Sequence, residues 1–166
     1  MRVLGIDPGL AITGYAVVEG EEGGALQAVA YGAIRTAAGR PLPERLVRIY
    51  DHLCSILDEY QPHVLAVERI FFGRNVTTAL TVGQARGVVL LCAAQHQLPV
   101  VEYKPAEIKQ ALVGYGNAAK QQVQYMVRAQ LDLPETPRPD DVADALAVAL
   151  CHLTVGQFWA RIRDTR

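Results

Sequence analysis

Four carboxylates stand where a charged side chain is unfavourable unless a cation lies near it. Asp7 and Glu68 each end a short apolar run, and Asp141 and Asp144 lie in the first turns of an apolar helix. Burying an unpaired carboxylate costs free energy, and two aspartates three residues apart on a helix repel each other. Oxygen ligands without histidine or thiolate suit Mg²⁺ or Mn²⁺. The pattern therefore predicts a divalent-metal site.

The chemistry of such a site follows from its ions. Two divalent ions about 4 Å apart can activate a water and stabilise the leaving oxygen of an in-line phosphoryl displacement. The predicted reaction is phosphodiester hydrolysis. Each carboxylate also has a simpler explanation: Asp7 begins a common Asp-Pro-Gly turn, Glu68 could pair with an arginine, and the helix dipole could stabilise either Asp141 or Asp144.

An aromatic and basic segment follows Glu68 directly. Phe71 and Phe72 precede Arg74 and Asn75 in what reads as an exposed loop. Aromatic faces beside a cation suit unstacked bases and phosphates, so we expect this loop to bind nucleic acid. The alternative is that the two phenylalanines belong to the core.

Three lysines are candidates for phosphate contacts, because few acidic residues surround them in the sequence. They are Lys104, Lys109 and Lys120. Lys120 follows the glycine-containing segment 114–117 and could therefore reach a substrate phosphate. Surface lysines are also common simply as solvated side chains.

The elements that must position these residues alternate in type. We predict strands at 2–7, 13–19, 28–35, 63–68 and 99–103, and helices at 43–60, 77–95, 105–112, 118–131 and 140–153. This order favours an α/β fold with a mixed sheet of about five strands. Gly83 and Gly87 lie one turn apart on the second helix, which suits either helix-to-sheet packing or a subunit interface.

The length of 166 residues and the 51% hydrophobic content suit one domain. We expect that domain to span 1–156 and the tail 157–166 to be loose. The net charge is −1, yet residues 69–131 hold seven basic and two acidic side chains, as a surface that binds nucleic acid would. No apolar run approaches the roughly 20 residues of a membrane span, and the start is too acidic for a signal peptide, so we expect a cytoplasmic protein.

The cysteines and histidines give no metal-binding signal in the sequence. Cys54, Cys92 and Cys151 are far apart and odd in number, which suits buried thiols in a reducing compartment. The histidines, likewise without paired spacing, are His52, His63, His96 and His152. We therefore predict neither a disulfide nor a zinc site.

The chain resembles the RuvC family of Holliday-junction resolvases over nearly its whole length. The matching segments are Gly5-Ile6-Asp7-Pro8-Gly9, Val67-Glu68, Gly83-Gln84-Ala85-Arg86-Gly87, Lys109-Gln110 and Ala143-Asp144-Ala145-Leu146-Ala147. The resemblance implies a ribonuclease-H-like fold. It also implies a homodimer that makes paired symmetric nicks in four-way DNA junctions during recombination and repair, with a branch-migration motor complex as partner.

Individual roles follow from the same resemblance. Asp7, Glu68, Asp141 and Asp144 would be the catalytic carboxylates that bind two Mg²⁺ ions per site, with Mn²⁺ as a substitute. Lys120 would assist at the scissile phosphate, Lys109 would contact the DNA backbone, and Phe71 would stack on a base near the crossover, with Arg74 in the same loop. The third acidic position could be Asp140 or Asp141; alignment of the resemblance at Asp144 assigns it to Asp141, and Asp140 is most simply the N-cap of the helix. The resemblance also places the helix of Gly83 and Gly87 at or near the dimer interface.

Three other functions fit parts of the sequence. Another ribonuclease-H-like nuclease, acting on RNA:DNA hybrids or other branched DNA, would use the same metal chemistry. An actin-like ATPase also has an aspartate before a glycine after its first strand, but this chain lacks a second glycine-rich phosphate turn. A junction-binding scaffold would retain the basic surface without cleavage.

Overall fold

The computed structural model describes residues 1–21, 24–69 and 76–163. The elements of this part of the chain are, in order, β1 (Arg2–Asp7), β2 (Ile12–Gly20), β3 (Leu26–Arg35), α1 (Leu42–Tyr60), β4 (Val64–Glu68), α2 (Val76–Gln95), β5 (Val100–Tyr103), α3 (Pro105–Val113), α4 (Lys120–Gln130) and α5 (Asp140–Arg163). The predicted elements are all present, with bounds that differ by a few residues except at the end of α5.

The five strands form one mixed sheet in the order β3-β2-β1-β4-β5. β1 pairs antiparallel with β2 and parallel with β4, which in turn pairs parallel with β5. β1 therefore lies in the middle of the sheet, and its residues Val3, Leu4 and Ile6 are fully buried. This confirms the predicted α/β fold with a five-stranded mixed sheet.

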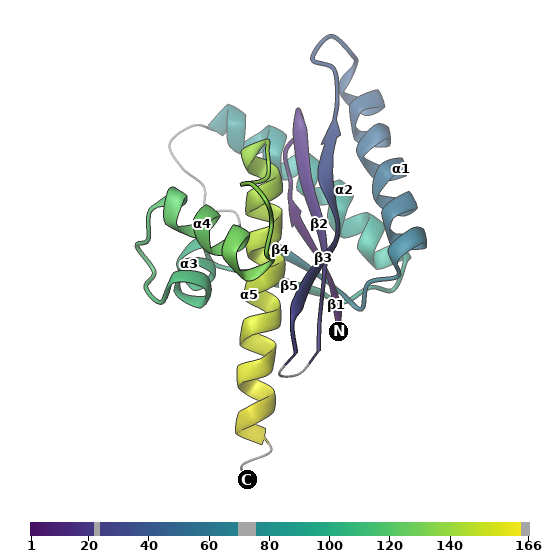
Figure 1. The fold of residues 1–166 in the computed structure, drawn as a ribbon. Coiled ribbons are helices and arrows are strands. Elements are labelled where there is room, and N and C mark those ends of the chain that lie inside the picture. Colours follow the sequence, from purple (N-terminus) through teal and green to yellow (C-terminus); the bar gives the residue numbers. More distant parts are fainter. Residues whose placement is uncertain (22–23, 70–75, 164–166) are drawn as a thin grey trace.

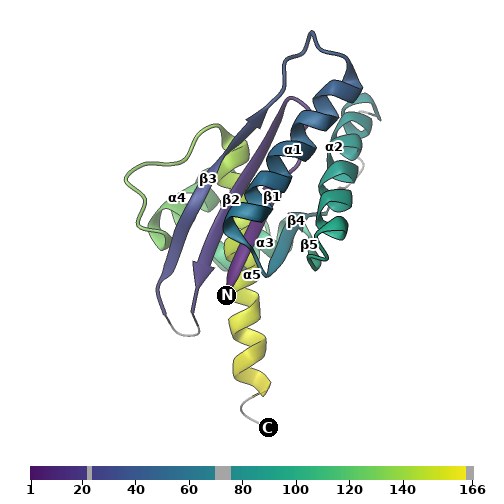
Figure 2. The ribbon, with the colours of Figure 1, turned by 90° about the vertical axis from the view of Figure 1, so that its right-hand side faces the viewer.

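Helices cover both faces of the sheet. α1 and α2 lie side by side on one face, and α5 crosses the other with α3 and α4 beside it (Figures 1 and 2). Alternate residues of β1 serve the two faces, as the twofold repeat of a strand requires. Leu4 and Ile6 pack in the core with α1 and α2, whereas Val3 packs in the core with α5.

Glycines in the strands let α5 approach the sheet closely. A Cβ atom on Gly5 would lie 2.1 Å from the carbonyl oxygen of Ala145, and one on Gly14 would lie 2.0 Å from that of Asp141. Real Cβ atoms do not approach other atoms so closely, so any side chain at either position would push α5 away. The start of α5 is therefore set directly against β1 and β2.

α5 is longer than the sequence predicted. It runs to Arg163, so the expected end of this helix near Leu153 is corrected. The prediction relied on apolar periodicity, which ends early. Ala160 and Arg161 nevertheless favour a helix, and the segment has no proline to end it.

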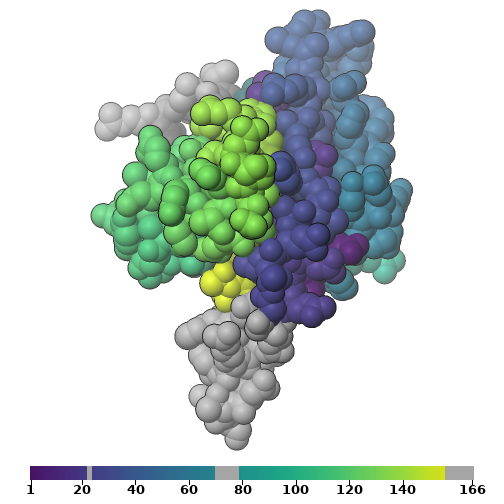
Figure 3. Space-filling view, viewed as in Figure 1, coloured from purple at the N-terminus to yellow at the C-terminus, as the bar shows by residue number. Residues whose placement is uncertain are grey.

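Along the described residues, no helix combines the length and apolar character that crossing a bilayer needs. Figure 3 shows the face of the molecule that holds α5, where α4 and the segment 131–139 lie beside β2 and β3.

Candidate active site

Two of the four predicted carboxylates end neighbouring strands. β1 and β4 run parallel, and Ile6 is paired with Val67. Asp7 and Glu68 are the next residues of the two strands, so they lie side by side at the carboxyl ends of β1 and β4. The turn beyond Asp7 is held by Thr13, whose buried hydroxyl donates to the carbonyl oxygen of Gly9 at 2.7 Å. The sheet therefore fixes both carboxylates from the backbone.

The other two carboxylates come from the first turns of α5. Asp7 is the register partner of Gly14, and Gly14 is also the residue against which the backbone of Asp141 packs. This close packing places Asp141 and Asp144 beside the strand end that holds Asp7. Residues more than 130 positions apart in the sequence thus meet at one site.

The electrostatics show how close the four groups are. Burial, followed by repulsion from Asp144, Asp141 and Glu68, raises the pKa of Asp7 to about 7. Burial and Asp144 also raise the pKa of Glu68, and burial raises that of Asp144. Each of these three acids is thus disfavoured in its charged form by its surroundings. A bound cation would relieve that penalty, so the donor set fits a divalent metal of the kind that prefers oxygen ligands.

Lys120 brings a positive charge into direct contact with the acidic residues of α5. Its Nζ lies 2.9 Å from Oδ2 of Asp144 and 3.3 Å from Oδ2 of Asp140. Partial burial acts to lower the pKa of Lys120, but the two aspartates outweigh this effect and raise it above its ordinary value. Lys120 is therefore a firmly charged ammonium group at the edge of the site.

The neighbouring Asp140 has different surroundings from the other acids. Its carboxylate binds Lys120 and accepts a hydrogen bond of 3.2 Å from Nε2 of Gln124, and Lys120 lowers its pKa. Asp141, by contrast, is one of the residues whose charge raises the pKa of Asp7. These contacts favour Asp141 over Asp140 as the third carboxylate of the site.

The arginine near Glu68 does not neutralise its carboxylate. Arg86, only 9% exposed, donates from Nη1 to the backbone oxygen of Glu68 at 2.8 Å and from Nη2 to Oε1 of Glu102 at 2.6 Å. Among the ion pairs between described residues, none involves the carboxylate of Glu68. Arg86 thus holds the end of β4 in place and leaves Glu68 available to a metal.

A pocket of about 270 Å³ opens beside the carboxylates. Glu68 and Asp144 line it together with Lys109 and Lys120, and the charge of Lys109 acts on Glu68. The structure therefore brings two of the three predicted lysines to the site. Lys104 is exposed at the start of α3 and does not line this pocket. The predicted DNA-binding residues Phe71, Phe72, Arg74 and Asn75 lie outside the described residues.

A cluster of arginines near the site was not predicted. Arg35, Arg40, Arg45 and Arg48 line a pocket of about 640 Å³, together with one acid, Glu44. Charge totals over long segments conceal this group, because acids elsewhere in residues 1–68 offset it. Counting basic residues in a short window, four within 35–48, would have revealed it.

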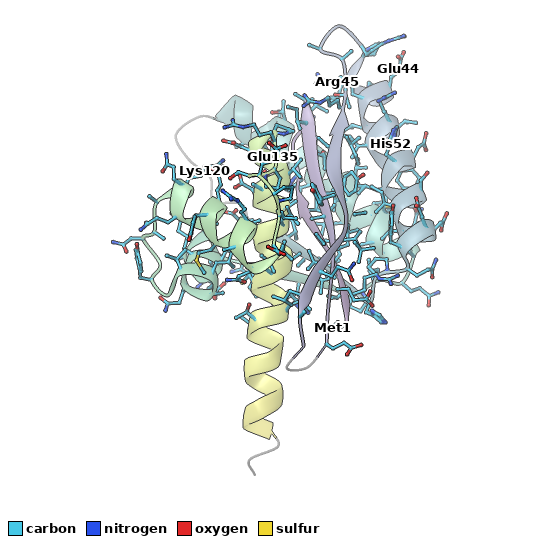
Figure 4. The ribbon with its side chains drawn as sticks, in the orientation of Figure 1. Met1, Glu44, Arg45, His52, Lys120 and Glu135 are labelled. Atoms are coloured by element: carbon cyan, nitrogen blue, oxygen red, sulfur yellow. The ribbon has the colours of Figure 1, made fainter. Side chains whose placement is uncertain are left out.

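Arg45 connects this arginine pocket with the acidic site. Its Nε donates to the Thr36 hydroxyl at 2.8 Å, and that hydroxyl donates to the carbonyl oxygen of Leu10 at 2.5 Å. Arg45 and Asp141 also line a common pocket of about 400 Å³. Figure 4 shows Arg45 and Lys120 at the same end of the molecule, where α5 begins. The arginine pocket therefore adjoins the acidic site, with Arg45 lying between them.

A mixed five-stranded sheet with carboxylates from two central strands and a final helix defines a metal-dependent nuclease of the ribonuclease-H-like class. The family model described as crossover junction endodeoxyribonuclease RuvC matches residues 3–152. The chain belongs to this family. All four carboxylates lie within the matched residues, and the family assignment excludes the actin-like ATPase considered above.

Individual relatives are similar over most of their length. The crossover junction endodeoxyribonuclease RuvC of Chloroflexus aggregans is 59% identical over 152 residues, which are 92% of each chain. That of Heliobacterium modesticaldum is 60% identical over 151 residues, 91% of this chain and 93% of the relative. The solved structure of T. thermophilus RuvC in complex with a Holliday junction substrate superposes with a TM-score of 0.91, at 40% identity and 96% coverage of both chains.

Proposed function

We propose that this protein resolves four-way DNA junctions by paired, symmetric nicks in recombination and repair. The observation that carries the proposal is the meeting of Asp7, Glu68, Asp141 and Asp144 at one edge of the sheet, in a chain of this family. The T. thermophilus relative, similar over 96% of both chains, was solved with such a junction.

The four carboxylates are proposed to hold two Mg²⁺ ions, with Mn²⁺ able to substitute. When bound, these ions would supply Lewis acidity for activating water and for stabilising the leaving oxygen. The sheet positions Asp7 and Glu68, and α5 positions the other two. Because burial and the neighbouring acids raise the pKa of Asp7 to about 7, metal binding near neutral pH would compete with protonation of this carboxylate.

Lys120 is proposed to contact the scissile phosphate. Its ammonium group pairs with Asp140 and Asp144 in the absence of substrate. A bound metal would take over the charge of Asp144, which would allow Lys120 to turn toward a phosphate oxygen. Lys109, in the same pocket, is placed to bind the neighbouring backbone.

The remaining substrate contacts would come from two surfaces. Lys104 and the loop residues Phe71, Phe72, Arg74 and Asn75 are proposed to bind DNA near the crossover, with Phe71 stacked on a base. The arginine pocket would hold a DNA arm through its phosphates, since Arg45 links that pocket to Asp141.

A homodimer is proposed because two symmetric nicks need two identical sites related by a twofold axis. α2 has an exposed face suited to contact with a second copy. Leu80 and Leu91 are 61% and 53% exposed, and between them a Cβ atom added to Gly83 or Gly87 would have nothing within 4 Å. A closely approaching partner helix would bury this face. A branch-migration motor complex is proposed as the further partner, and we expect the reaction to take place in the cytoplasm.

The decisive experiment incubates the purified protein and Mg²⁺ with a mobile synthetic four-way junction, a matched duplex and an RNA:DNA hybrid. Mapping the ends on denaturing gels should show paired nicks at symmetric positions of the junction. Faster cleavage of the hybrid would replace the proposal with a ribonuclease, and binding without cleavage in Mg²⁺ or Mn²⁺ would indicate a scaffold.

A further inference from the structure

We propose that Cys54, Cys92 and His96 form a Zn²⁺ site that joins α1 to α2. The Sγ atoms of Cys54 and Cys92 lie 3.4 Å apart, and Sγ of Cys92 lies 3.9 Å from Nδ1 of His96. The three ligand atoms all lie within 4.8 Å of one another. No sequence motif indicates this group, because 38 residues separate the two cysteines and only the packing of the helices brings them together.

The distances suit a tetrahedral ion. With Zn–S bonds of about 2.3 Å and Zn–N bonds of about 2.0 Å, ligand atoms at tetrahedral angles lie about 3.5–3.8 Å apart. The S–S separation of 3.4 Å is about 0.4 Å shorter than the tetrahedral value of about 3.8 Å, and the S–N separation of 3.9 Å is about 0.4 Å longer than the tetrahedral value of about 3.5 Å. A zinc ion would therefore need the two sulfur atoms to move apart and Nδ1 of His96 to turn from the carbonyl oxygen of Cys92 toward the ion, with water completing the coordination as the fourth ligand.

Each helix contributes a pair of residues one turn apart. Cys54 and Asp58 face the cluster from α1, and Cys92 and His96 face it from α2. Oδ1 of Asp58 lies 3.6 Å from Nε2 of His96. Histidines that bind zinc commonly donate their other ring N–H to a carboxylate, which fixes the tautomer and strengthens the ligand. Asp58 is positioned for this role.

Zinc binding would change the hydrogen bonding of His96. Nδ1 lies 2.8 Å from the carbonyl oxygen of Cys92, so without metal this nitrogen is suited to carry the proton and donate it there. In the zinc complex the proton would be on Nε2, directed at Asp58, and the lone pair of Nδ1 would bind the ion. The hydrogen bond from Nδ1 to the carbonyl oxygen of Cys92 would thus be replaced by one from Nε2 to Asp58.

The chemistry of the cluster selects a thiophilic cation. A thiol must lose its proton to bind a metal, so binding of an ion at Cys54 and Cys92 would release protons. Zn²⁺ binds thiolate and imidazole well, whereas Mg²⁺ prefers oxygen. Cys92 is buried, but Cys54 is half-buried and His96 is exposed, so an ion can enter from solvent.

The site would tie together the two helices that cover one face of the sheet. It is independent of the junction-cleaving function proposed above, because its ligands lie on α1 and α2 and the four carboxylates lie on β1, β4 and α5. Cys92 directly follows Leu91 of the exposed face of α2. Zinc would therefore also hold in place the helix that we propose to contact the second subunit.

The test titrates the full-length protein, kept reduced, first with Co²⁺ and then with Zn²⁺. Co²⁺ bound by thiolates gives a sulfur-to-metal charge-transfer band, which carboxylates do not produce, so the acidic site cannot cause it. We expect this band to saturate at one Co²⁺ per chain and to vanish when Zn²⁺ displaces the cobalt. Zn²⁺ should also raise the melting temperature in an Asp7→Asn background.

Variants separate this site from adventitious binding. Cys54→Ser and His96→Gln should abolish the charge-transfer band or weaken Zn²⁺ affinity by more than about 100-fold, and Asp58→Asn by about 10-fold. His52→Gln is the matched control, because His52 is also exposed on a helix with Nδ1 2.9 Å from a carbonyl oxygen one turn earlier. It should bind Zn²⁺ like the unaltered chain.

Three results would overturn the proposal. The first is the absence of a charge-transfer band with Co²⁺. The second is equal Zn²⁺ affinity in His96→Gln and His52→Gln. The third is a protein that forms a Cys54–Cys92 disulfide when oxidised but does not bind Zn²⁺ when reduced. Junction cleavage by His96→Gln in Mg²⁺ should match that of the unaltered chain, so failure of the zinc site and failure of the nuclease assignment are distinguishable.

Discussion

The ammonium group of Lys120 lies 2.9 Å from Oδ2 of Asp144, a carboxylate of the acidic site. The chain thus places its own cation against a group that we propose as a metal ligand. This contact reduces repulsion among the acids. It also keeps an ammonium group close to the place where we expect a substrate phosphate. When metal and DNA bind, the Lys120–Asp144 ion pair would be replaced by two contacts: Asp144 would bind the metal, and Lys120 would bind a phosphate.

Replacing Lys120 tests that exchange. We expect Lys120→Met to lower the single-turnover rate of junction cleavage by about 100-fold, since one preorganised charge near the phosphate is lost. Junction affinity in Ca²⁺ should fall much less. Lys104→Met is the control, because Lys104 is exposed and does not line the carboxylate pocket. Equal losses in the two variants would mean that Lys120 only adds positive charge to the surface.

Replacing Asp7 should separate binding from cleavage. Asp7→Asn removes a central ligand and should lower cleavage by more than about 100-fold. Junction affinity should be kept or increased, because one negative charge facing the phosphates is removed. Gel-shift titration and denaturing gels measure the two effects. Loss of both binding and cleavage, with a lowered melting temperature, would instead indicate a structural role for Asp7.

The raised pKa of Asp7 predicts how stability depends on pH. The folded-state pKa of about 7 exceeds the ordinary value of 3.8, so the folded protein binds more protons than the unfolded chain between these values. Without metal, the free energy of unfolding should therefore fall as pH rises from about 4 to about 7, by at most about 1.4 kcal/mol per pH unit from this group. Glu68 and Asp144, also raised, act in the same direction.

Urea unfolding in EDTA at pH 5, 6 and 7 measures this dependence. Asp7→Asn should flatten it, and saturating Mg²⁺ should reverse it, because the metal binds the deprotonated acids. Stability that rises steadily over this interval without metal would contradict the electrostatic account of the site.

The packing of α5 on β2 can be tested at Gly14. Gly14→Ala places a Cβ 2.0 Å from the backbone of Asp141, so α5 must shift. We expect a loss of about 1–3 kcal/mol in the free energy of unfolding and a larger loss of cleavage than of junction binding. Gly39→Ala is the control, since nothing lies within 4 Å of its Cβ position. Unaltered cleavage in Gly14→Ala would show that the site tolerates movement of α5.

The arginine pocket makes a prediction about salt dependence. If Arg45 and Arg48 each neutralise one phosphate, Arg45→Gln and Arg48→Gln should each weaken junction binding and reduce the slope of log K against log salt by about 0.9. Nicking at saturating protein should change less. Arg128→Gln, on α4 and outside this pocket, should leave the slope unchanged. An unchanged slope in Arg45→Gln would remove this pocket from the DNA-binding surface.

The predictions from sequence succeeded where one local pattern was enough. Apolar runs that end in Asp7 and Glu68 mark both the strands and the acids at their ends, and alternation of strands and helices predicts the layers. Contacts between elements that are distant in sequence could not be predicted from the sequence. The pair of Lys120 with Asp140, the link of Arg45 to Leu10, and the cluster of Cys54 with Cys92 all depend on how elements pack. The length of α5 was underestimated because the prediction relied on apolar periodicity, whereas a helix can continue beyond the residues that follow that pattern.

Gly5 and Gly14, against which α5 packs, set the position of only two of the four carboxylates. The acidic site therefore has two carboxylates fixed by the sheet and two whose position depends on α5. Asp7 and Glu68 belong to neighbouring strands, and no single substitution can separate them without breaking the ladder between β1 and β4. Asp141 and Asp144 move with a helix whose distance from the sheet is set by the absence of side chains at Gly5 and Gly14. For protein engineering, these glycines are therefore the positions at which carboxylate spacing, and with it the choice of metal ion, could be tuned while the sheet stays unchanged.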